Sequence, residues 1–422
     1  MTLLRALNHR NYRLYFLGQG ISQMGTWMQI MAMSWLVYRL TASPFMLGAI
    51  SFSSQVPSLL FGPLAGVVSD RFSRHRIIIF TQVLSMLQAA VLAGLVLTGS
   101  IAIWQLFILS LLLGCVNAFD MPVRQSFVID LLEHRRDLPN AIALNSMMIN
   151  IARLVGPSAA GILISLVGEG MCFLLNAVSF LAVIAALLAM RVHPARSAPS
   201  GGSTLEALRE GYEYAFRLPP IKYMIFLMAT VSMVGLSFPV LMPIFAGDIY
   251  AGGPHTLGYL MGAIGVGAFV GGFYLASRKS AAGLEKAIPV AVALFGTALV
   301  LFSQVRHLGA ALAILFLAGL GMILFISSTN TLLQTVVDDD KRGRVMSLYT
   351  MSFMGMAPFG SLIAGSLASH IGTPETVLFG GLVSIAGGAL FAWRLPRMKP
   401  YFAQAFKRHE AASRENPPEA KP

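Results

Sequence analysis

The chain has 422 residues, of which 56% are hydrophobic and only 11% are charged. A soluble globular domain carries about 25% charged residues. This composition therefore excludes a soluble protein and indicates an integral membrane protein. The formal net charge of +12 has to be explained by where the cations lie along the chain.

Twelve runs of the chain are long and apolar enough to cross a bilayer. A membrane helix needs about 20 apolar residues, whereas a barrel strand needs only about 10 with alternating polarity, so the runs predict helices. A count of ten or eleven would require merging runs that Gly-, Pro- or charge-bearing turns separate. The predicted spans are 14–37, 45–69, 77–98, 101–120, 142–167, 170–190, 220–247, 256–277, 286–304, 309–330, 344–370 and 374–393.

The basic residues lie almost entirely on one side of this topology. Twelve spans place both termini on the same side, and 27 of the 30 lysines and arginines fall in the termini and loops of that side. Basic loops face the cytoplasm. We therefore expect a multi-pass protein of the bacterial inner membrane with both termini cytoplasmic, no cleavable signal peptide and no nucleic-acid partner.

The first span carries glutamines near one face. With Thr26 on the same face, Gln19, Gln23 and Gln29 suit a water-filled cavity better than lipid, and we expect Gln19 and Gln23 to line a central cavity. Hydrogen bonding between helices is the alternative interpretation.

A dense charge cluster, "GVVSDRFSRHR", interrupts the chain between the second and third spans. The topology rule alone explains Arg71, Arg74 and Arg76, because basic residues anchor cytoplasmic loops. It does not explain Asp70, which follows Gly66 by one helical turn.

These residues resemble the loop 2–3 signature of the major facilitator superfamily, Gly-x-x-x-Asp-Arg-x-Gly-Arg-x-x, with Ser73 replacing the second Gly. The resemblance implies an all-α fold of twelve helices in two pseudo-symmetric six-helix bundles, and a reversible cytoplasmic clasp. In the family the Asp faces the start of helix 11, where Arg342 and Arg344 lie here. An Arg pairs with an acid at the end of helix 4, a place that we expect Asp120 to occupy.

Longer strings narrow the resemblance. "DMPVRQSFVIDLL", "NAIALNSMMINIARLVGPSAAG" and "RGRVMSLYTMSFMGMAPFGSLIAG" resemble the branch that holds siderophore exporters and macrolide-type drug efflux pumps. The resemblance covers nearly the whole chain. It implies a monomeric secondary transporter that exports a small amphipathic molecule by alternating access, with the proton gradient as energy source and no cofactor.

The fifth span contains an arginine near the middle of the membrane. An ionisable residue at that depth is a functional-site hypothesis, and Asn150 lies one turn before Arg153 on the same face. We expect both to line the central cavity. A structural arginine capped by neighbouring carbonyl groups is the alternative.

The same span carries residues suited to close packing and a kink. Gly156, Pro157 and Gly161 resemble the exporter-type signature Gly-Pro-x-x-Gly-Gly, with Ala160 replacing one Gly. Pro358 is their counterpart in the eleventh span, because the two halves of the chain echo each other weakly.

The longest hydrophilic interruption divides the chain after six spans. It predicts an N-terminal bundle at 1–190, a cytoplasmic linker at 191–219 and a C-terminal bundle at 220–395. Within the linker, Ser203 and Glu206 form a capping-box pattern that opens an amphipathic helix on the membrane surface. We expect the tail, 396–422, to be disordered and cytoplasmic.

Few polar residues of the second half suggest function. Asn330, at the cytoplasmic end of the tenth span, is a further candidate for the central cavity. The candidate proton carriers are Asp70, Asp120 and Asp248, with the last two at helix ends.

Other functions fit the sequence less well. Neither cysteine lies in a metal-ligand pattern and no nucleotide-binding motif appears, so we expect no metal and no nucleotide. An integral-membrane enzyme would need a cluster such as Glu133, His134 and Asp137, which lacks metal-ligand spacing. A lysolipid or lipid transporter of the same fold, and a membrane protein without transport activity, remain open.

Overall fold

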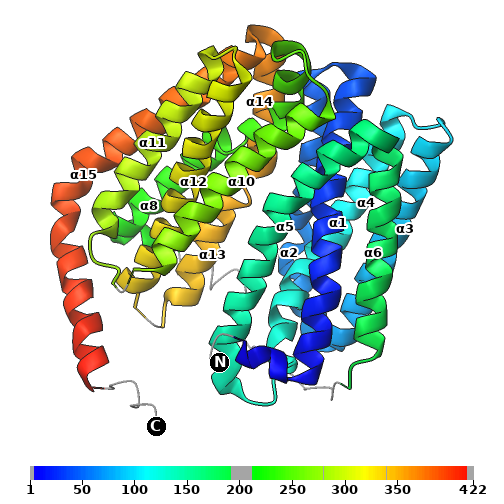
Figure 1. The fold of residues 1–422 in the computed structure, drawn as a ribbon. Helices are drawn as coiled ribbons and strands as arrows, with labels where there is room; N and C mark the ends of the chain where they lie inside the picture. The colour runs from blue at the N-terminus through cyan, green and yellow to red at the C-terminus, as the bar shows by residue number, and fades with distance from the viewer. Residues whose placement is uncertain (1–3, 192–211, 279, 339, 416–422) are drawn as a thin grey trace. The chain divides into compact units, whose positions relative to one another are not determined.

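The computed structural model describes residues 4–191, 212–278, 280–338 and 340–415, apart from the side chains of residues 63, 66, 67, 69, 70, 135 and 409–415. Over these ranges every regular element is a helix (Figure 1). The protein is an all-α polytopic membrane protein, as the sequence predicts. Helices satisfy their backbone hydrogen bonds within the segment, which the bilayer interior requires.

Six long helices form from the first half of the chain. Most begin and end within a few residues of the predicted spans, but the fourth extends ten residues further. They are α1 Arg10–Thr41, α2 Pro44–Arg71, α3 Arg74–Leu97, α4 Ile103–Asp130, α5 Leu138–Val167 and α6 Glu169–Leu188. The short 3-10 turns η1 Arg5–Asn8 and η2 Arg135–Asp137 precede α1 and α5.

The second half forms helices α8 Pro219–Thr230, α10 Pro254–Ala276, α11 Leu284–Gln304, α12 Leu308–Val336, α13 Arg342–Phe353, α14 Ala357–Ile371 and α15 Thr373–Glu415. Between α8 and α10 the chain passes through η3 Val231–Gly235, η4 Phe238–Leu241, α9 Met242–Ile244 and η5 Phe245–Ile249. Pro239 and Pro243 lack the amide hydrogen that a continuous helix needs, so π and 3-10 turns replace the α-helix there. The eleventh predicted span is interrupted at 354–356, just before Pro358.

Among the described residues, eleven helices, two of them interrupted, are long and apolar enough to cross a membrane. α1 is not one of them, although it has 32 residues. Its glutamines lower its hydropathy, and Gln19, Gln23 and Gln29 are all buried. α1 is therefore the twelfth membrane-length helix, with its polar side chains turned into the protein.

The described helices belong to two compact units. Unit 1 comprises Met1–Ser200, Pro239–Gly265 and Ser361–Thr373, and unit 2 comprises Gly201–Phe238, Val266–Gly360 and Pro374–Pro422. In unit 1, α1 packs against α5 and α6, α3 packs against α6, and α2 packs against α4; in unit 2, α11 packs along α12. The boundaries differ from the predicted bundles because two segments of the second half pack on first-half helices.

The tail that the sequence predicts to be disordered is helical as far as Glu415, the last residue that the structure describes. α15 has 43 residues and continues well beyond the predicted span (Figure 1). Met398, Phe402 and Ala405 recur at helical spacing and are buried. Their burial stabilises the extension, so the expectation of disorder is wrong for 396–415.

The amphipathic helix predicted in the linker falls largely on 192–211, outside the described residues, and so do Ser203 and Glu206. Residues 212–217 are helical. Tyr212 and Phe216 stack there with ring centres 4.2 Å apart, and both are exposed.

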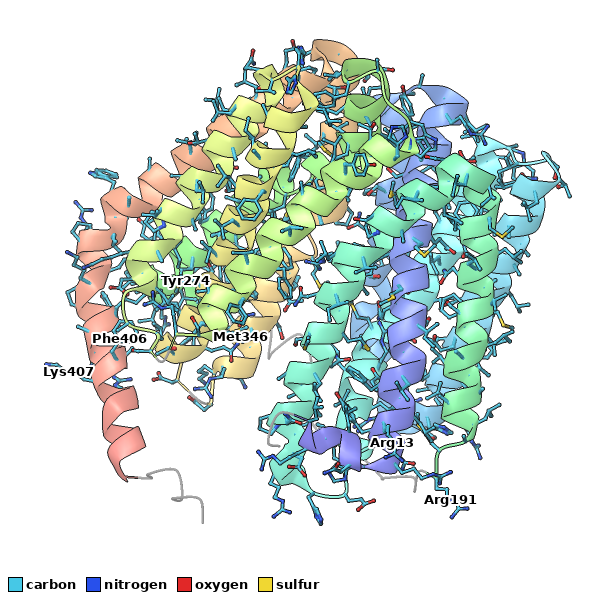
Figure 2. All side chains as sticks on the ribbon, in the orientation of Figure 1. Arg13, Arg191, Tyr274, Met346, Phe406 and Lys407 are labelled. Atoms are coloured by element: carbon cyan, nitrogen blue, oxygen red, sulfur yellow. The ribbon has the colours of Figure 1, made fainter. Side chains whose placement is uncertain are left out.

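Each unit has one end at which basic residues gather. Arg13 and Arg191 lie at the same end of unit 1 (Figure 2), and the Asn11 side chain donates to the carbonyl oxygen of Arg191 at 3.0 Å. In unit 2, Lys407 lies at the end where α13 begins (Figure 2). We call these the basic ends, and the opposite end of unit 1, where α1 finishes, the distal end.

Candidate gating and substrate sites

The charge cluster lies at the basic end of unit 1. Only two residues separate α2 from α3. Arg74 pairs there with Asp130, the last residue of α4, at an N–O distance of 3.1 Å. Gly66 and Asp70 belong to the last turns of α2, and the Asp70 side chain lies outside the described residues. Two arginines of the cluster are exposed: Arg71 and Arg76. Arg342 and Arg344 lie in the first turn of α13, in unit 2.

Asp120 is buried inside unit 1, with 4% of its surface exposed. Its Oδ1 accepts hydrogen bonds from Thr81 Oγ1 and Gln82 Nε2, both at 2.8 Å. Its Oδ2 lies 3.4 Å from Nε of Arg124, one turn later in α4. A buried carboxylate is costly unless it is paired and hydrogen-bonded, and these three partners meet that requirement.

The expectation that Asp120 ends the fourth helix is wrong. α4 continues for ten more residues because Val123 and Phe127 carry its buried face onward. The acid that ends α4 and pairs with the loop arginine is Asp130. The sequence does not mark Asp130 as the end of this helix, because the predicted apolar span stops at residue 120 and the helix continues to residue 130.

Arg153 lies near the middle of α5 in an aromatic and apolar setting. Its guanidinium carbon is 5.1 Å from the centre of the Trp27 ring of α1. Its Nε is buried without a hydrogen-bond partner, and none of the described carboxylates forms an ion pair with it. A cation–π contact contributes about 0.5–2 kcal/mol, less than the several kcal/mol that desolvating a cation costs. The guanidinium therefore retains the capacity to bind an acceptor.

The other predicted cavity residues have varied surroundings. Gln19 is buried with an unpartnered Oε1, and Gln23 is 9% exposed. Asn150 is exposed and donates to a carbonyl one turn earlier in α5. In unit 2, Asn330 accepts a short hydrogen bond from Gln334, one turn later in α12.

Gln29 corrects the idea that the glutamine face of α1 lines a cavity throughout. Its side chain donates to Gln88 of α3 at 3.0 Å and accepts from Asn176 of α6 at 2.8 Å. This buried network joins three helices of unit 1. Hydrogen bonding between helices, the alternative, therefore holds for Gln29, and periodicity within α1 could not reveal partners on other helices.

The glycines and prolines of the α5 signature lie at close helix contacts. A Cβ at Gly156 would be 2.6 Å from Cβ of Trp27, so glycine lets α5 approach α1 and keeps Trp27 near Arg153. Pro157 is buried beside it. In unit 2, Pro358 is the second residue of α14, directly after the break that separates α13 from α14.

Two pairs of glycines meet near the distal end of unit 1. Gly48 of α2 faces Gly365 of α14, and a Cβ on Gly48 would lie 2.4 Å from a carbonyl oxygen of α14. Gly161 of α5 faces Gly258 of α10, and a Cβ on Gly161 would lie 2.8 Å from a carbonyl oxygen of α10. We call these two crossings the distal seam. They join the helices so closely that only glycine fits.

A polar contact lies beside the distal seam. Tyr38 of α1 donates to Oδ1 of Asp248 in η5 through a short hydrogen bond of 2.5 Å. Next to Tyr38, Nε of Arg39 lies 2.7 Å from Glu169 at the start of α6. Asp248 is a candidate proton carrier from the sequence, but the sequence gives no sign of its partner Tyr38, because 210 residues separate the two.

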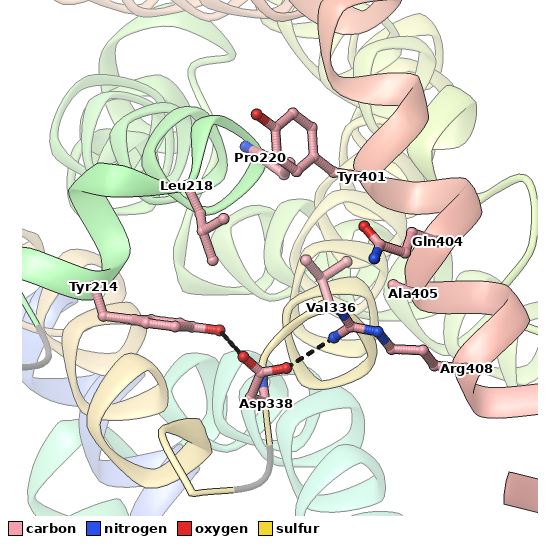
Figure 3. Close-up of a pocket in the computed structure, with 9 residues that line it drawn as sticks. All are labelled: Tyr214, Leu218, Pro220, Val336, Asp338, Tyr401, Gln404, Ala405 and Arg408. Atoms are coloured by element: carbon pink, nitrogen blue, oxygen red, sulfur yellow. Dashed lines mark hydrogen bonds and ion pairs between the residues drawn. The ribbon is translucent and has the colours of Figure 1, made fainter.

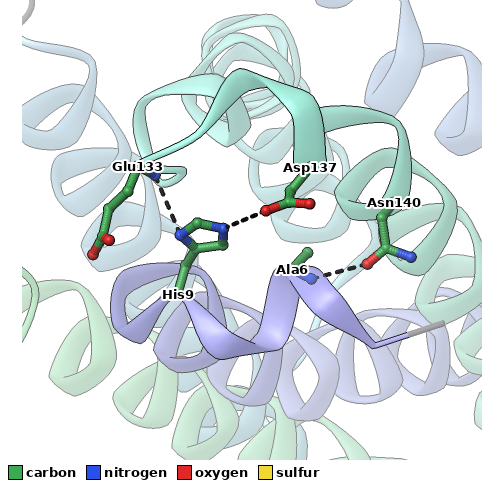
Figure 4. A network of polar contacts seen from close by, with 5 residues as sticks. All are labelled: Ala6, His9, Glu133, Asp137 and Asn140. Carbon is green, nitrogen blue, oxygen red and sulfur yellow. Dashed lines mark hydrogen bonds and ion pairs between the residues drawn. The ribbon is translucent and has the colours of Figure 1, made fainter. Parts of the chain in front are cut away.

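His9, just before α1, binds the loop between α4 and α5 (Figure 4). The ring Nδ1 accepts from the backbone N–H of Glu133 at 3.3 Å, so Nε2 carries the hydrogen and donates to Asp137 at 3.0 Å. This hydrogen bond, with the charges of Arg5 and Arg136, lowers the pKa of Asp137. The contact therefore stabilises the fold above the usual Asp pKa and is lost as the pH falls through the lowered value.

At the basic end of unit 2, three separate segments meet in one hydrogen-bonded cluster (Figure 3). Tyr214 donates to Asp338 Oδ2 at 2.9 Å, and Arg408 of α15 pairs with Oδ1 at 3.0 Å. Burial raises the pKa of the Tyr214 hydroxyl, which keeps it a donor. The cluster fastens the extended α15 to the chain between α12 and α13.

The clustering of acids, histidines and cysteines does not suggest a metal centre. Over the described ranges, no group of three or more such residues could hold a metal ion. Glu133 and Asp137 belong to the only cluster that the sequence offers as a possible enzyme site. In the structure both form hydrogen bonds with His9.

A family model described as "Transmembrane secretion effector" matches residues 1–415. The chain belongs to this family of the major facilitator superfamily. This membership agrees with the resemblance in the sequence to the siderophore and drug exporter branch. Several relatives of the chain are named as transporters or efflux pumps.

The relatives of this family member have similar lengths. The Staphyloferrin A transporter of Staphylococcus aureus is 27% identical over 377 residues, which cover 88% of this chain and 91% of the relative. The multidrug efflux pump Tap of Mycolicibacterium fortuitum is 24% identical, with coverages of 89% and 93%. Macrolide efflux protein A of Streptococcus pyogenes is 24% identical, with coverages of 89% and 95%.

Solved structures resemble the fold of this family member. A bacterial homologue of the human lysosomal transporter Spinster, inward-facing and unoccupied, matches with a TM-score of 0.68 and 15% identity over 94% of this chain and 98% of that one. A bacterial homologue of the iron transporter ferroportin, also inward-facing, matches with a TM-score of 0.66 and 17% identity over 92% and 98%. At these identities the likeness concerns the fold alone.

Proposed function

We propose that this protein exports a small amphipathic molecule, a siderophore or a drug, across the bacterial inner membrane. It acts as a monomeric secondary transporter that alternates access between the two sides and uses the proton gradient. Both termini lie in the cytoplasm, because the basic ends face that side. The relatives that transport a siderophore, several drugs or macrolides support this choice of substrate class.

Arg153 is the observation that carries the proposal about the substrate. It is a half-buried cation on a membrane helix, with an aromatic face on one side, a buried Nε and no ion pair with any described carboxylate. A substrate that brings an anionic or hydrogen-bond-accepting group would complete its coordination. Gln23 and Asn150 are proposed to share this contact, with Gln19 and Asn330 as further cavity residues.

The clasp at the basic ends and the distal seam are proposed as the two gates. Asp70, Arg74 and the paired Asp130 serve the first, and the two glycine crossings with Tyr38 and Asp248 serve the second. Proton uptake at Asp248 would weaken the contact with Tyr38, because a protonated carboxyl is a weaker acceptor than a carboxylate. Asp120 and Asp70 are the alternative proton carriers.

Arg153 variants test the proposal through efflux of one anionic and one cationic dye in inverted membrane vesicles. Arg153→Ala should lose the anionic dye selectively, by at least about tenfold if one charge-assisted hydrogen bond of about 1.5–3 kcal/mol is removed. Arg153→Lys keeps the charge but not the planar fork, so it should retain partial transport of the anion.

The two dyes distinguish a substrate contact from a structural role. Improved export of the cation by Arg153→Ala would support a charge in the substrate path. Equal loss of both dyes by correctly folded protein would show that Arg153 is structural and would overturn the substrate proposal.

A further inference from the structure

α8 and α15 of unit 2 form an apolar groove on their outer side. The groove is lined on α8 by Tyr223, Phe226 and Leu227, and on α15 by Gly387, Leu390 and Phe391. A Cβ at Gly387 would lie only 3.1 Å from Cδ1 of Leu227. Glycine at 387 therefore lets Leu227 of α8 pack against the backbone of α15, and these two residues form the floor of a shallow groove.

The groove ends at the membrane surface on the basic side. Arg394 is the twenty-second residue of α15, which begins at Thr373. At 1.5 Å per residue it lies about 32 Å along the helix, which matches the roughly 30 Å of hydrocarbon in a bilayer. Tyr223, the fifth residue of α8, has its ring centre 5.7 Å from the guanidinium carbon of Arg394, so α8 begins near the level that Arg394 marks on α15.

Arg394 is held above the groove by two aromatic rings. Its guanidinium carbon lies 4.4 Å from the centre of the Trp393 ring and 5.7 Å from that of Tyr223. Its Nε is buried without a hydrogen-bond partner. The arginine is thus oriented by its neighbours, and its guanidinium forms no hydrogen bond or ion pair with any described residue.

The surrounding charge is positive. The sequence of α15 contains no acidic residue between Glu375 and Glu410, and the chain around α8 contains none between Glu213 and Asp248. Lys222 and Arg397 are exposed close by in the sequence. Phe226 and Trp393, 59% and 66% exposed, are suited to lipid and its interface.

We propose that this groove is a binding site for an anionic phospholipid of the leaflet that the basic ends face. One acyl chain lies in the groove along Phe226, Leu227 and Gly387, and the phosphodiester accepts hydrogen bonds from Arg394. Lys222 contributes long-range attraction. Zwitterionic lipids fit the groove equally well, but they offer the arginine a phosphate whose charge their own ammonium group offsets.

Native mass spectrometry of the delipidated full-length protein tests this site. The protein is titrated with phosphatidylglycerol or with phosphatidylcholine of the same acyl chains. The first phosphatidylglycerol adduct should form at about fivefold lower lipid concentration, the preference expected when one basic residue contacts an anionic headgroup. Equal titrations of the two lipids would overturn the proposal.

Variants locate the preference. Arg394→Gln should abolish the difference between the lipids, whereas Arg397→Gln, the matched control three residues later, should keep it. Gly387→Leu fills the groove and should weaken the first adduct of both lipids. If Arg394→Gln does not fold, Arg394→Lys should show an intermediate preference. An equal loss with Arg397→Gln would show general surface attraction and contradict the assigned site.

Discussion

Single hydrogen bonds between distant residues hold unit 1 together near its distal end. Tyr38 and Asp248 are far apart in the chain, yet their side chains meet directly. A hydrogen bond to a carboxylate contributes about 1.5–3 kcal/mol. An interaction of this size can shift a conformational equilibrium by one to two orders of magnitude, and it depends on the protonation of one group.

Asp248→Asn tests whether this contact couples transport to protons. The amide can still accept from Tyr38, but it cannot take up a proton. The measurement uses membrane vesicles energised by a pH difference. There we expect the variant to equilibrate the substrate across the membrane but not to accumulate it against its own concentration gradient. Tyr38→Phe leaves the carboxyl group but removes the contact that protonation is proposed to weaken, so it should also reduce accumulation of the substrate. Full accumulation of the substrate by Asp248→Asn would show that Asp248 is not the proton carrier and would leave Asp120 and Asp70 as the candidates.

At the scale of helices, glycine determines where elements can approach. Gly48 and Gly161 occur on different helices, but each faces a second glycine and a backbone carbonyl of its partner helix. Backbone cannot rotate away as a flexible side chain can. A methyl group at either position must therefore push the helices apart.

Gly48→Ala tests the distal seam in α2. Its Cβ would lie 2.4 Å from a carbonyl oxygen, and such overpacking typically costs about 1–3 kcal/mol. We expect a lower midpoint of thermal unfolding in detergent. Gly62→Ala in the same helix is the matched control, because its Cβ meets nothing within 4 Å, and it should be neutral or slightly stabilising. Equal midpoints of thermal unfolding for the two variants would show that Gly48 does not lie at a close helix contact.

The extension of α15 shows how packing overrides a polar composition. The segment after Leu395 is rich in basic residues and contains two prolines, which suggests a disordered tail. Its apolar residues nevertheless share one face, and Arg408 fastens it to Asp338. The helix persists because that face is covered.

At the scale of the whole molecule, the distribution of charge determines the orientation in the membrane. We expect reporter fusions after residues 40, 100, 168, 252, 307 and 373 to be active only on the periplasmic side. Fusions in the basic loops serve as controls and should report the cytoplasm. Cytoplasmic signals at two or more of the six positions would contradict the twelve-helix arrangement with cytoplasmic termini.

The sequence by itself determined the fold class, the approximate helix positions and the family resemblance. Burial of about 20 apolar residues in lipid is a local requirement, so each run reports its own helix. Arg153 was also recognisable, because a cation in an apolar run is conspicuous without knowledge of its neighbours.

Only the tertiary structure decided which side chains meet. Four sets of contacts join different helices: Arg74 with Asp130, Thr81 and Gln82 with Asp120, the network of Gln29, and Tyr38 with Asp248. Such contacts depend on how far each helix extends and how it is rotated. A hydrophobic pattern leaves both uncertain: α4 extends ten residues, nearly three turns, beyond its predicted end, and this makes Asp130 rather than Asp120 the acid that pairs with Arg74.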